Sequence, residues 1–82
     1  VEPAESAVLS GGRPGGHKID GIGAGYIVPL WKEGLADRIE PVSSDDAFRT
    51  ALRLAREEGI FGGSTTGANV AAALRIAREL GP

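Results

Sequence analysis

The chain has 82 residues, with nine Lys and Arg against eleven Asp and Glu, a net charge of −2, one His, and no Cys or Met. A chain this short forms at most one small domain and buries only about 60% of its unfolded surface. The lack of Cys excludes disulfides, one His is too few for a metal centre, and no basic stripe suggests nucleic-acid binding. The longest apolar run, Tyr26–Trp31, is too short to span a membrane, and we expect a cytoplasmic protein.

The ends of the sequence suggest a larger parent. There is no initiator Met, Val1–Pro3 opens the chain without a leader or helix cap, and Gly81-Pro82 is a helix stop that leaves no place for a final strand. We therefore expect a segment of a longer protein. A processed small domain is the alternative.

The first half of the chain is expected to be mostly loop. Residues 1–3 are predicted to end a strand, residues 4–9 to form a short helical turn, and residues 10–20 to form a loop in which five positions are Gly or Pro. A short strand is predicted over Arg38–Val42. Its Pro41 indicates a sheet edge or a strand end, because proline donates no backbone hydrogen bond.

The second half is predicted to begin with an amphipathic helix. This helix spans about residues 44–58 and ends at Gly59. Ser43 or Ser44 is expected to cap its N-terminus, where two acidic residues also suit the helix dipole. The predicted core face repeats at helical spacing and comprises Phe48, Ala51, Leu52 and Ala55.

A second strand and a second helix complete the predicted order. The strand is expected at Ile60–Phe61 and the helix over about Ala68–Leu80. The apolar stripe of this helix is predicted to comprise Val70, Ala73, Leu74 and Ala77. Strand, helix, strand and helix in this order predict an α/β fold, a βαβα unit with a parallel sheet and a right-handed crossover.

Two glycine clusters, Gly21–Gly25 and Gly62–Gly67, carry most of the functional information. Glycines at this spacing let the backbone adopt positive φ values and approach a ligand closely. Thr65 and Thr66 add hydroxyl groups just before the predicted helix, beside its positive dipole end. We interpret the clusters as two walls of a small-molecule site at the ends of α/β elements.

Each of these signals also has a purely structural interpretation. The first cluster is G-x-G-x-G and lacks the preceding strand and the later acidic residue of a dinucleotide site, so a glycine-rich turn is the alternative. Either Thr65 or Thr66 would serve only as a helix cap, with Asn69 closing a capping box. His17 and Lys18 are typical of a solvated loop pair. No Walker or G-x-S-x-G motif occurs.

Several motifs occur in a characteristic order. After Val1–Pro3 come H-K-I-x-G-I-G-A-G at 17–25, E-E-G-I at 57–60, and T-T-G-A at 65–68 followed by an alanine-rich helix. This pattern resembles the cysteine synthase family of fold-type II pyridoxal-phosphate-dependent enzymes over the whole chain. The resemblance implies a tryptophan synthase β-like, three-layer αβα fold. In it, residues 1–82 are a single partial domain, the C-terminal part of the large pyridoxal 5′-phosphate-binding domain.

The resemblance also implies particular site residues. In the family a hydroxyl residue of the second motif, usually in Ser-Ser-Gly, hydrogen-bonds the pyridine nitrogen of the cofactor, and that position falls on Thr65. A hydroxyl is a neutral partner that does not hold the ring nitrogen protonated, which favours β-elimination and replacement. The backbone implied to line the substrate pocket is that of Gly21, Ile22, Gly23 and Ala24.

The resemblance places no catalytic residue in this chain, and we expect no metal ligand. The Schiff-base lysine of the family and its carboxylate-binding and phosphate-binding loops precede this region. Lys18 and Lys32 are the only lysines, and neither lies in that lysine's context. The implied parent is an enzyme that makes L-cysteine from O-acetylserine and sulfide by β-replacement, whereas the segment alone is expected to be inactive.

The implied partners are a second copy in a homodimeric parent and serine acetyltransferase, with no nucleic acid and no membrane. Two alternatives stay open. One is a cystathionine β-synthase-like β-replacing enzyme, which shares much of this region. The other is a non-catalytic partner-binding module, which would stay colourless when mixed with the cofactor because it lacks the lysine.

Overall fold

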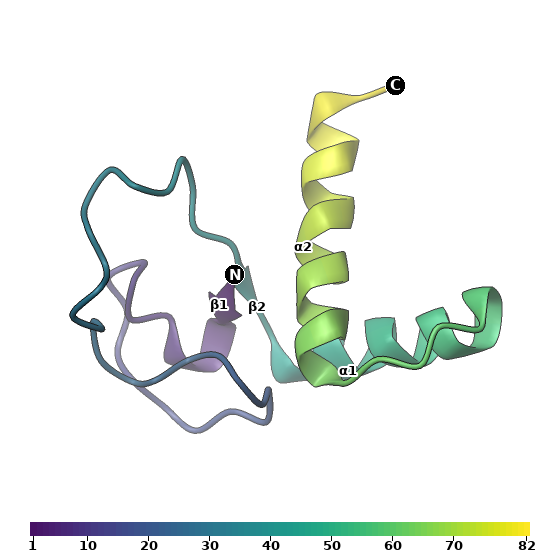
Figure 1. Ribbon diagram of the computed structural model, residues 1–82, viewed down its shortest axis with the longest axis horizontal. Coiled ribbons are helices and arrows are strands. Elements are labelled where there is room, and N and C mark those ends of the chain that lie inside the picture. The colour runs from purple at the N-terminus through teal and green to yellow at the C-terminus, as the bar shows by residue number, and fades with distance from the viewer.

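The computed structural model describes all residues, 1–82, as two helices beside a small sheet and a long loop (Figure 1). Strands β1 (Glu2–Pro3) and β2 (Pro41–Val42) run parallel, with Glu2 opposite Pro41 and Pro3 opposite Val42. A turn of 3₁₀-helix, η1 (Ala4–Ser6), follows β1. The predicted α/β class and parallel sheet are confirmed. The predicted order of strand, helix, strand and helix does not form, because both strands precede α1, and β2 is shorter than the strand predicted over residues 38–42.

Both predicted helices are present, and the second is longer than predicted. Helix α1 (Ser44–Arg53) continues into a stretch of π-helix, η2 (Leu54–Glu58), and ends at Gly59, whose φ of 67° lies in the region that favours glycine. Helix α2 spans Ser64–Leu80 and therefore begins before the predicted start at Ala68. Neither helix is long and apolar enough to cross a membrane.

No strand forms at Ile60 and Phe61, so that prediction is wrong. Their side chains are 52% and 89% exposed. A strand needs a neighbouring strand for its backbone groups, whereas the Ile60 N–H bonds back to the Leu54 carbonyl at 3.1 Å and completes the end of the preceding helix. In this chain the sheet consists of β1 and β2 alone.

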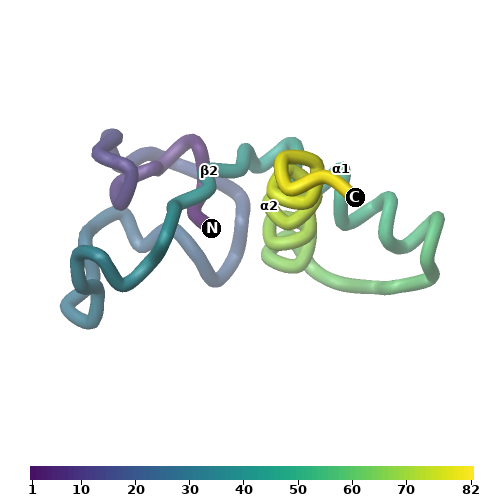
Figure 2. Tube along the Cα trace, turned by 90° about the horizontal axis from the view of Figure 1, so that it is seen from above, coloured from purple at the N-terminus to yellow at the C-terminus, as the bar shows by residue number.

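Helices α1 and α2 pack against each other through their smallest residues. Figures 1 and 2 show α2 standing across the start of α1, with the loop on the far side of the sheet. Ala47 of α1 and Ala68 of α2 are fully buried, and a Cβ on Gly67 would overlap the Ala47 carbonyl oxygen. Glycine is therefore needed at position 67. The hydrophobic core consists of Ile19, Val42, Ala47, Ala68 and Ala72.

The predicted core faces of both helices are wrong for the same reason. Phe48 and Leu52 are 48% and 50% exposed, and Leu74 is 41% exposed. The buried helical positions are small instead, and they are Ser44, Ala47, Gly67, Ala68 and Ala72. The helical spacing of apolar residues predicts that the most apolar face of a helix is buried. Where two helices cross closely, the face with the smallest side chains is buried instead, because only there can the backbones approach.

Two carboxylates near the N-terminus organise the loop and the start of α1. Glu2 is only 4% exposed, and it accepts hydrogen bonds from the backbone N–H groups of Leu9 and Ser10 at 2.9 Å each. Glu5 accepts from the Ser44 N–H through both carboxylate oxygens, at 2.9 and 3.1 Å. This bond to the helix N-terminus lowers the pKa of Glu5, because it stabilises the charged form.

Charged side chains connect α2 to the edge of the sheet. Arg38 pairs with both Glu40 and Glu79, and its hydrogen bond holds the pKa of Glu79 below the usual range. Arg75 donates to the Pro41 carbonyl of β2 at 2.6 Å. Exposed ion pairs contribute little to stability, so the half-buried Arg75 bond is the firmer link between α2 and β2.

The Gly67→Ala substitution should lower the free energy of unfolding by about 1–3 kcal/mol, because overpacking at a close crossing forces the backbones apart. Urea denaturation of a protein that carries this chain measures the change. Gly16→Ala is the matched control, since nothing lies within 4 Å of a Cβ there, and it should change stability by less than about 0.5 kcal/mol. Equal losses in the two variants would contradict the close crossing.

Glu5 should make stability depend on acid pH. Because its folded pKa is lowered from 4.5, its contribution is complete above that value and declines as the pH falls through the lowered pKa. Glu5→Gln should therefore be less stable than the unmodified protein at neutral pH, and the difference should shrink below pH 4.5. Unfolding measured across this range tests it, with Glu58→Gln as the control that removes an exposed carboxylate. A gap between the Glu5→Gln and unmodified proteins that stays constant with pH would contradict the assignment.

Candidate functional site

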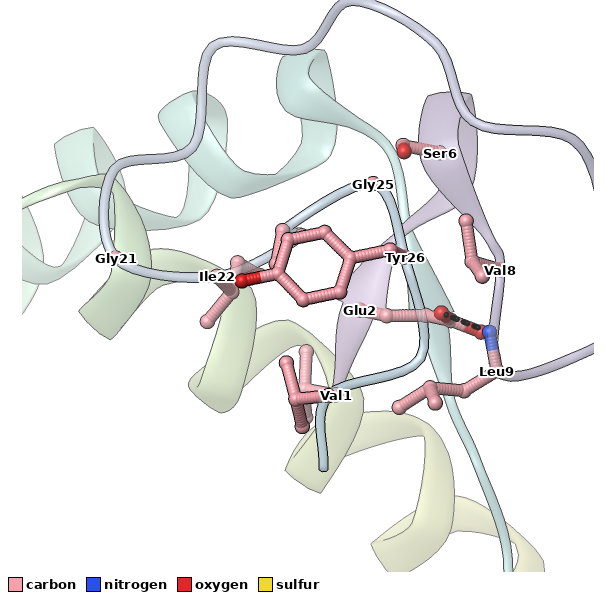
Figure 3. Close-up of a pocket in the computed structure, with 12 residues that line it drawn as sticks. Val1, Glu2, Ser6, Val8, Leu9, Gly21, Ile22, Gly25 and Tyr26 are labelled. Atoms are coloured by element: carbon pink, nitrogen blue, oxygen red, sulfur yellow. Dashed lines mark hydrogen bonds between the residues drawn. The ribbon is translucent and has the colours of Figure 1, made fainter. Parts of the chain in front are cut away.

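A cavity of about 380 Å³ lies between the N-terminal segment and the first glycine cluster (Figure 3). Figure 3 shows the side chains of Val1, Leu9 and Tyr26 gathered around it, with the Gly21–Tyr26 backbone along one side. The residues of this cluster that line the cavity include the four predicted for a substrate pocket, Gly21, Ile22, Gly23 and Ala24. Their role toward a substrate remains a prediction.

Backbone rather than side chains forms much of this wall. Gly21, Gly23 and Gly25 have φ values of 86°, 70° and 83°, a region that costs other residues roughly 1–2 kcal/mol. Across Gly23–Tyr26, the Gly23 carbonyl is the one backbone group with a hydrogen-bond partner in this chain. The N–H groups of the segment are therefore available to a ligand.

The two glycine clusters meet at Asp20. Its N–H donates to the Ser64 hydroxyl at 3.2 Å across 44 residues of sequence, and the Thr65 hydroxyl donates to its carbonyl. The Thr65 Oγ1 atom lies 3.5 Å from the position that a Cβ on Gly21 would occupy. The first turn of α2 thus fixes the residue that precedes the Gly21–Tyr26 segment, which we call the glycine wall. Thr65 itself does not line the cavity.

Thr66 does not cap the helix, so that interpretation is wrong. Gly63 occupies the N-cap position without a side-chain hydrogen bond, and Thr65 and Thr66 lie within the first turn of α2. A Cβ on Gly62 would overlap the Thr66 side chain. The helix begins early because Ser64 and Thr65 bond to the Asp20 backbone, a distant partner that local sequence patterns do not reveal.

His17 contacts the first glycine cluster without lining the cavity, a contact that the interpretation as a solvated loop pair missed. Its Nδ1 accepts from the Ile19 N–H at 3.2 Å, and its Nε2 lies 2.9 Å from the Gly23 carbonyl oxygen. Lys18 is exposed, and only its backbone N–H is engaged, donating to the Ser44 hydroxyl at 3.0 Å. The H-K-I-x-G spacing was visible in the sequence, but the turn that brings His17 back to Gly23 was not.

These features belong to a known class of protein. The family described as pyridoxal-phosphate dependent enzyme matches residues 1–82, and the chain belongs to this family. Among its relatives, the probable cysteine synthase of Bacillus subtilis is 49% identical over all 82 residues, and the cysteine synthase of Staphylococcus aureus is 46% identical over 81. The resemblance inferred from the motifs is thereby confirmed.

Solved structures agree with the sequence relatives. The cysteine synthase of Entamoeba histolytica matches with a TM-score of 0.81 and 42% identity, over 84% of this chain and 20% of that one. A hydrogen sulfide-producing enzyme from Fusobacterium nucleatum matches with a TM-score of 0.89 and 44% identity, over 96% and 27%. The chain spans about a quarter of its curated relatives, 26% in both cases.

Glycine should be more important at position 23 than at position 25. Both positions have positive φ, so Gly25→Ala should lose roughly 1–2 kcal/mol of stability from backbone strain alone. A Cβ at Gly23 would also lie 2.5 Å from His17 Nε2 and from Pro3 Cγ, so Gly23→Ala should lose at least about 1 kcal/mol more. Urea denaturation compares the two, and a smaller loss for Gly23→Ala would contradict the packing around it.

Proposed function

We propose that this chain is the C-terminal part of the large cofactor-binding domain of a cysteine synthase, which makes L-cysteine from O-acetylserine and sulfide by β-replacement. The identity to relatives named cysteine synthase over the whole chain supports this proposal. The observation that carries it is the contact between the two glycine clusters at Asp20 and Thr65. This contact sets the proposed cofactor-binding hydroxyl beside the proposed substrate pocket.

Thr65 is the proposed partner of the pyridine nitrogen of pyridoxal 5′-phosphate, and its chemistry fits that role. Its hydroxyl has one proton and two lone pairs, and rotation about the Cβ–Oγ1 bond redirects the proton from the Asp20 carbonyl to a ring nitrogen. The absent side chain of Gly21 leaves room beside it. When bound, the cofactor supplies an electron sink for β-elimination and replacement, and a neutral hydroxyl suits this chemistry.

The backbone of Gly21, Ile22, Gly23 and Ala24 is the proposed substrate wall. It would bind and orient the amino-acid substrate through free N–H groups, and its lack of large side chains lets the reacting carbon approach. The amine that must meet the aldehyde of the cofactor is proposed to come from another part of the parent, since neither Lys18 nor Lys32 lines the cavity. The 82-residue chain alone should therefore make no cysteine above background.

Direct assays of a full-length protein that carries this chain distinguish cysteine synthesis from two other activities. O-acetylserine with sulfide tests cysteine synthesis, and serine with homocysteine tests a cystathionine β-synthase-like reaction. The Fusobacterium nucleatum relative, a hydrogen sulfide-producing enzyme, favours a third assay in which cysteine alone is supplied and sulfide is measured. Activity only in the second or third assay would overturn the proposal, and a colourless protein after addition of cofactor would indicate a binding module.

The remaining parts of the proposal concern the parent as a whole. We propose a cytoplasmic homodimer with serine acetyltransferase as a partner. Resemblance to the family supports these assignments. Size-exclusion chromatography of the full-length protein, alone and mixed with the acetyltransferase, tests the dimer and the complex, and cell fractionation tests the location.

Thr65→Val removes the proposed cofactor contact at nearly constant volume. The loss of one neutral hydrogen bond corresponds to about 0.5–1.5 kcal/mol, so cofactor affinity or turnover in the full-length enzyme should fall roughly 2- to 13-fold. Cofactor titration followed by absorbance, together with cysteine synthesis, measures the effect.

Ser64→Ala is the control for this variant. It removes the other bond to Asp20 but keeps the Thr65 hydroxyl, so a loss of tethering alone would weaken both variants equally. Cofactor binding that is impaired in Thr65→Val and retained in Ser64→Ala supports the assignment. Unchanged binding in Thr65→Val refutes it.

A further inference from the structure

The hydrogen bonds of His17 define one tautomer of its neutral ring. The Ile19 backbone N–H is a donor, so the Nδ1 atom that it meets at 3.2 Å must be an unprotonated acceptor. In the neutral ring the proton then lies on Nε2, which donates to the Gly23 carbonyl at 2.9 Å. Both nitrogens are thus engaged with backbone on opposite sides of the same turn.

This donor holds the middle of the glycine wall. The Gly23 carbonyl has the only hydrogen bond of the Gly23–Tyr26 backbone within the chain. Gly23 is also packed closely, since a Cβ there would lie 2.5 Å from both His17 Nε2 and Pro3 Cγ of β1. His17 and Pro3 therefore fix the orientation of the peptide that links Gly23 to Ala24.

The orientation of this peptide determines the direction of the Ala24 N–H. All peptide bonds in the chain are trans, so the Ala24 N–H points opposite to the Gly23 carbonyl and away from His17. Ala24 lines the cavity, and its N–H has no acceptor in the chain. This N–H is therefore free to donate to an oxygen atom of a ligand.

We propose that His17 is a positioning residue for the substrate wall, acting through the Gly23–Ala24 peptide to present the Ala24 N–H to an oxygen of the amino-acid substrate. The identity of the ligand as an amino-acid substrate rests on the proposed function, whereas the restraint of the loop by the His17–Gly23 hydrogen bond does not. Without the Nε2–H donor the peptide is free to rotate, because glycine on one side offers little resistance to it. The substrate would then meet a donor that is only partly in place.

Two substitutions in the full-length enzyme separate the two ring contacts. His17→Asn keeps an acceptor near Nδ1 for the Ile19 N–H and loses the donor to Gly23, whereas His17→Gln extends an amide donor to the position of Nε2. We expect KM for O-acetylserine to rise about 3- to 10-fold in His17→Asn, the effect of one hydrogen bond. We expect kcat and cofactor absorbance to change little in His17→Asn, and KM to stay near the original value in His17→Gln.

Chymotryptic cleavage after Tyr26 gives a second measurement that does not depend on activity. Tyr26 is 63% exposed, so its cleavage rate reports how firmly the preceding loop is held. His17→Asn should be cut several times faster than the unmodified protein and His17→Gln at a similar rate.

The outcomes distinguish this proposal from the proposed function. If the unmodified full-length enzyme makes no cysteine, the proposed function fails, and the cleavage rates still decide whether His17 holds the loop. If the enzyme is active and His17→Asn leaves both KM and cleavage unchanged, the positioning role is refuted. A lowered melting temperature in both variants with KM and cleavage unchanged would also refute it, because that result indicates a structural role alone.

Discussion

The close approach of α1 and α2 is the constraint on which the rest of the structure depends. Because Gly67 has no side chain, the backbone of α2 lies directly against the Ala47 carbonyl. This contact fixes where the first turn of α2 begins and therefore where the Ser64 and Thr65 hydroxyls lie. A larger residue at 67 would move that turn away from the Asp20 backbone, and the two glycine clusters would no longer meet.

The candidate site is built from backbone that side chains hold in place. Most donors of the Gly21–Tyr26 segment are peptide N–H groups and not side chains. Hydrogen bonds at the Asp20 backbone and from His17 to the Gly23 carbonyl fix the direction of these peptides. Glycine makes such a wall possible because it adopts positive φ, and it also makes the wall soft. The hydrogen bonds at Asp20 and at the Gly23 carbonyl offset that flexibility.

Membership in the pyridoxal-phosphate dependent enzyme family explains which part of a site this chain supplies. It holds the Thr65 hydroxyl and the Gly21–Tyr26 backbone that we propose to bind cofactor and substrate, and neither of its two lysines lines the cavity. The exposed apolar side chains of α1, including Phe48 and Leu52, agree with a chain that spans only 26% of its relatives. Helical spacing identified these residues as a core face, and in this chain they remain half exposed.

The sequence by itself determined the local features, and the tertiary structure decided which of them act together. Caps and turn residues act within a few positions, so the sequence narrowed the cap of α1 to Ser43 or Ser44, of which Ser43 is the cap. The end of the helical segment at Gly59 and the family motifs were also predicted from the sequence. The strand expected at Ile60–Phe61 and the core face around Leu52 were not correct, because pairing and burial depend on distant neighbours. The junction of Asp20 with the first turn of α2 joins positions 44 residues apart. Only the tertiary structure brings such positions together. Sequence patterns report the local conformational preference of a segment and not which distant segments it contacts.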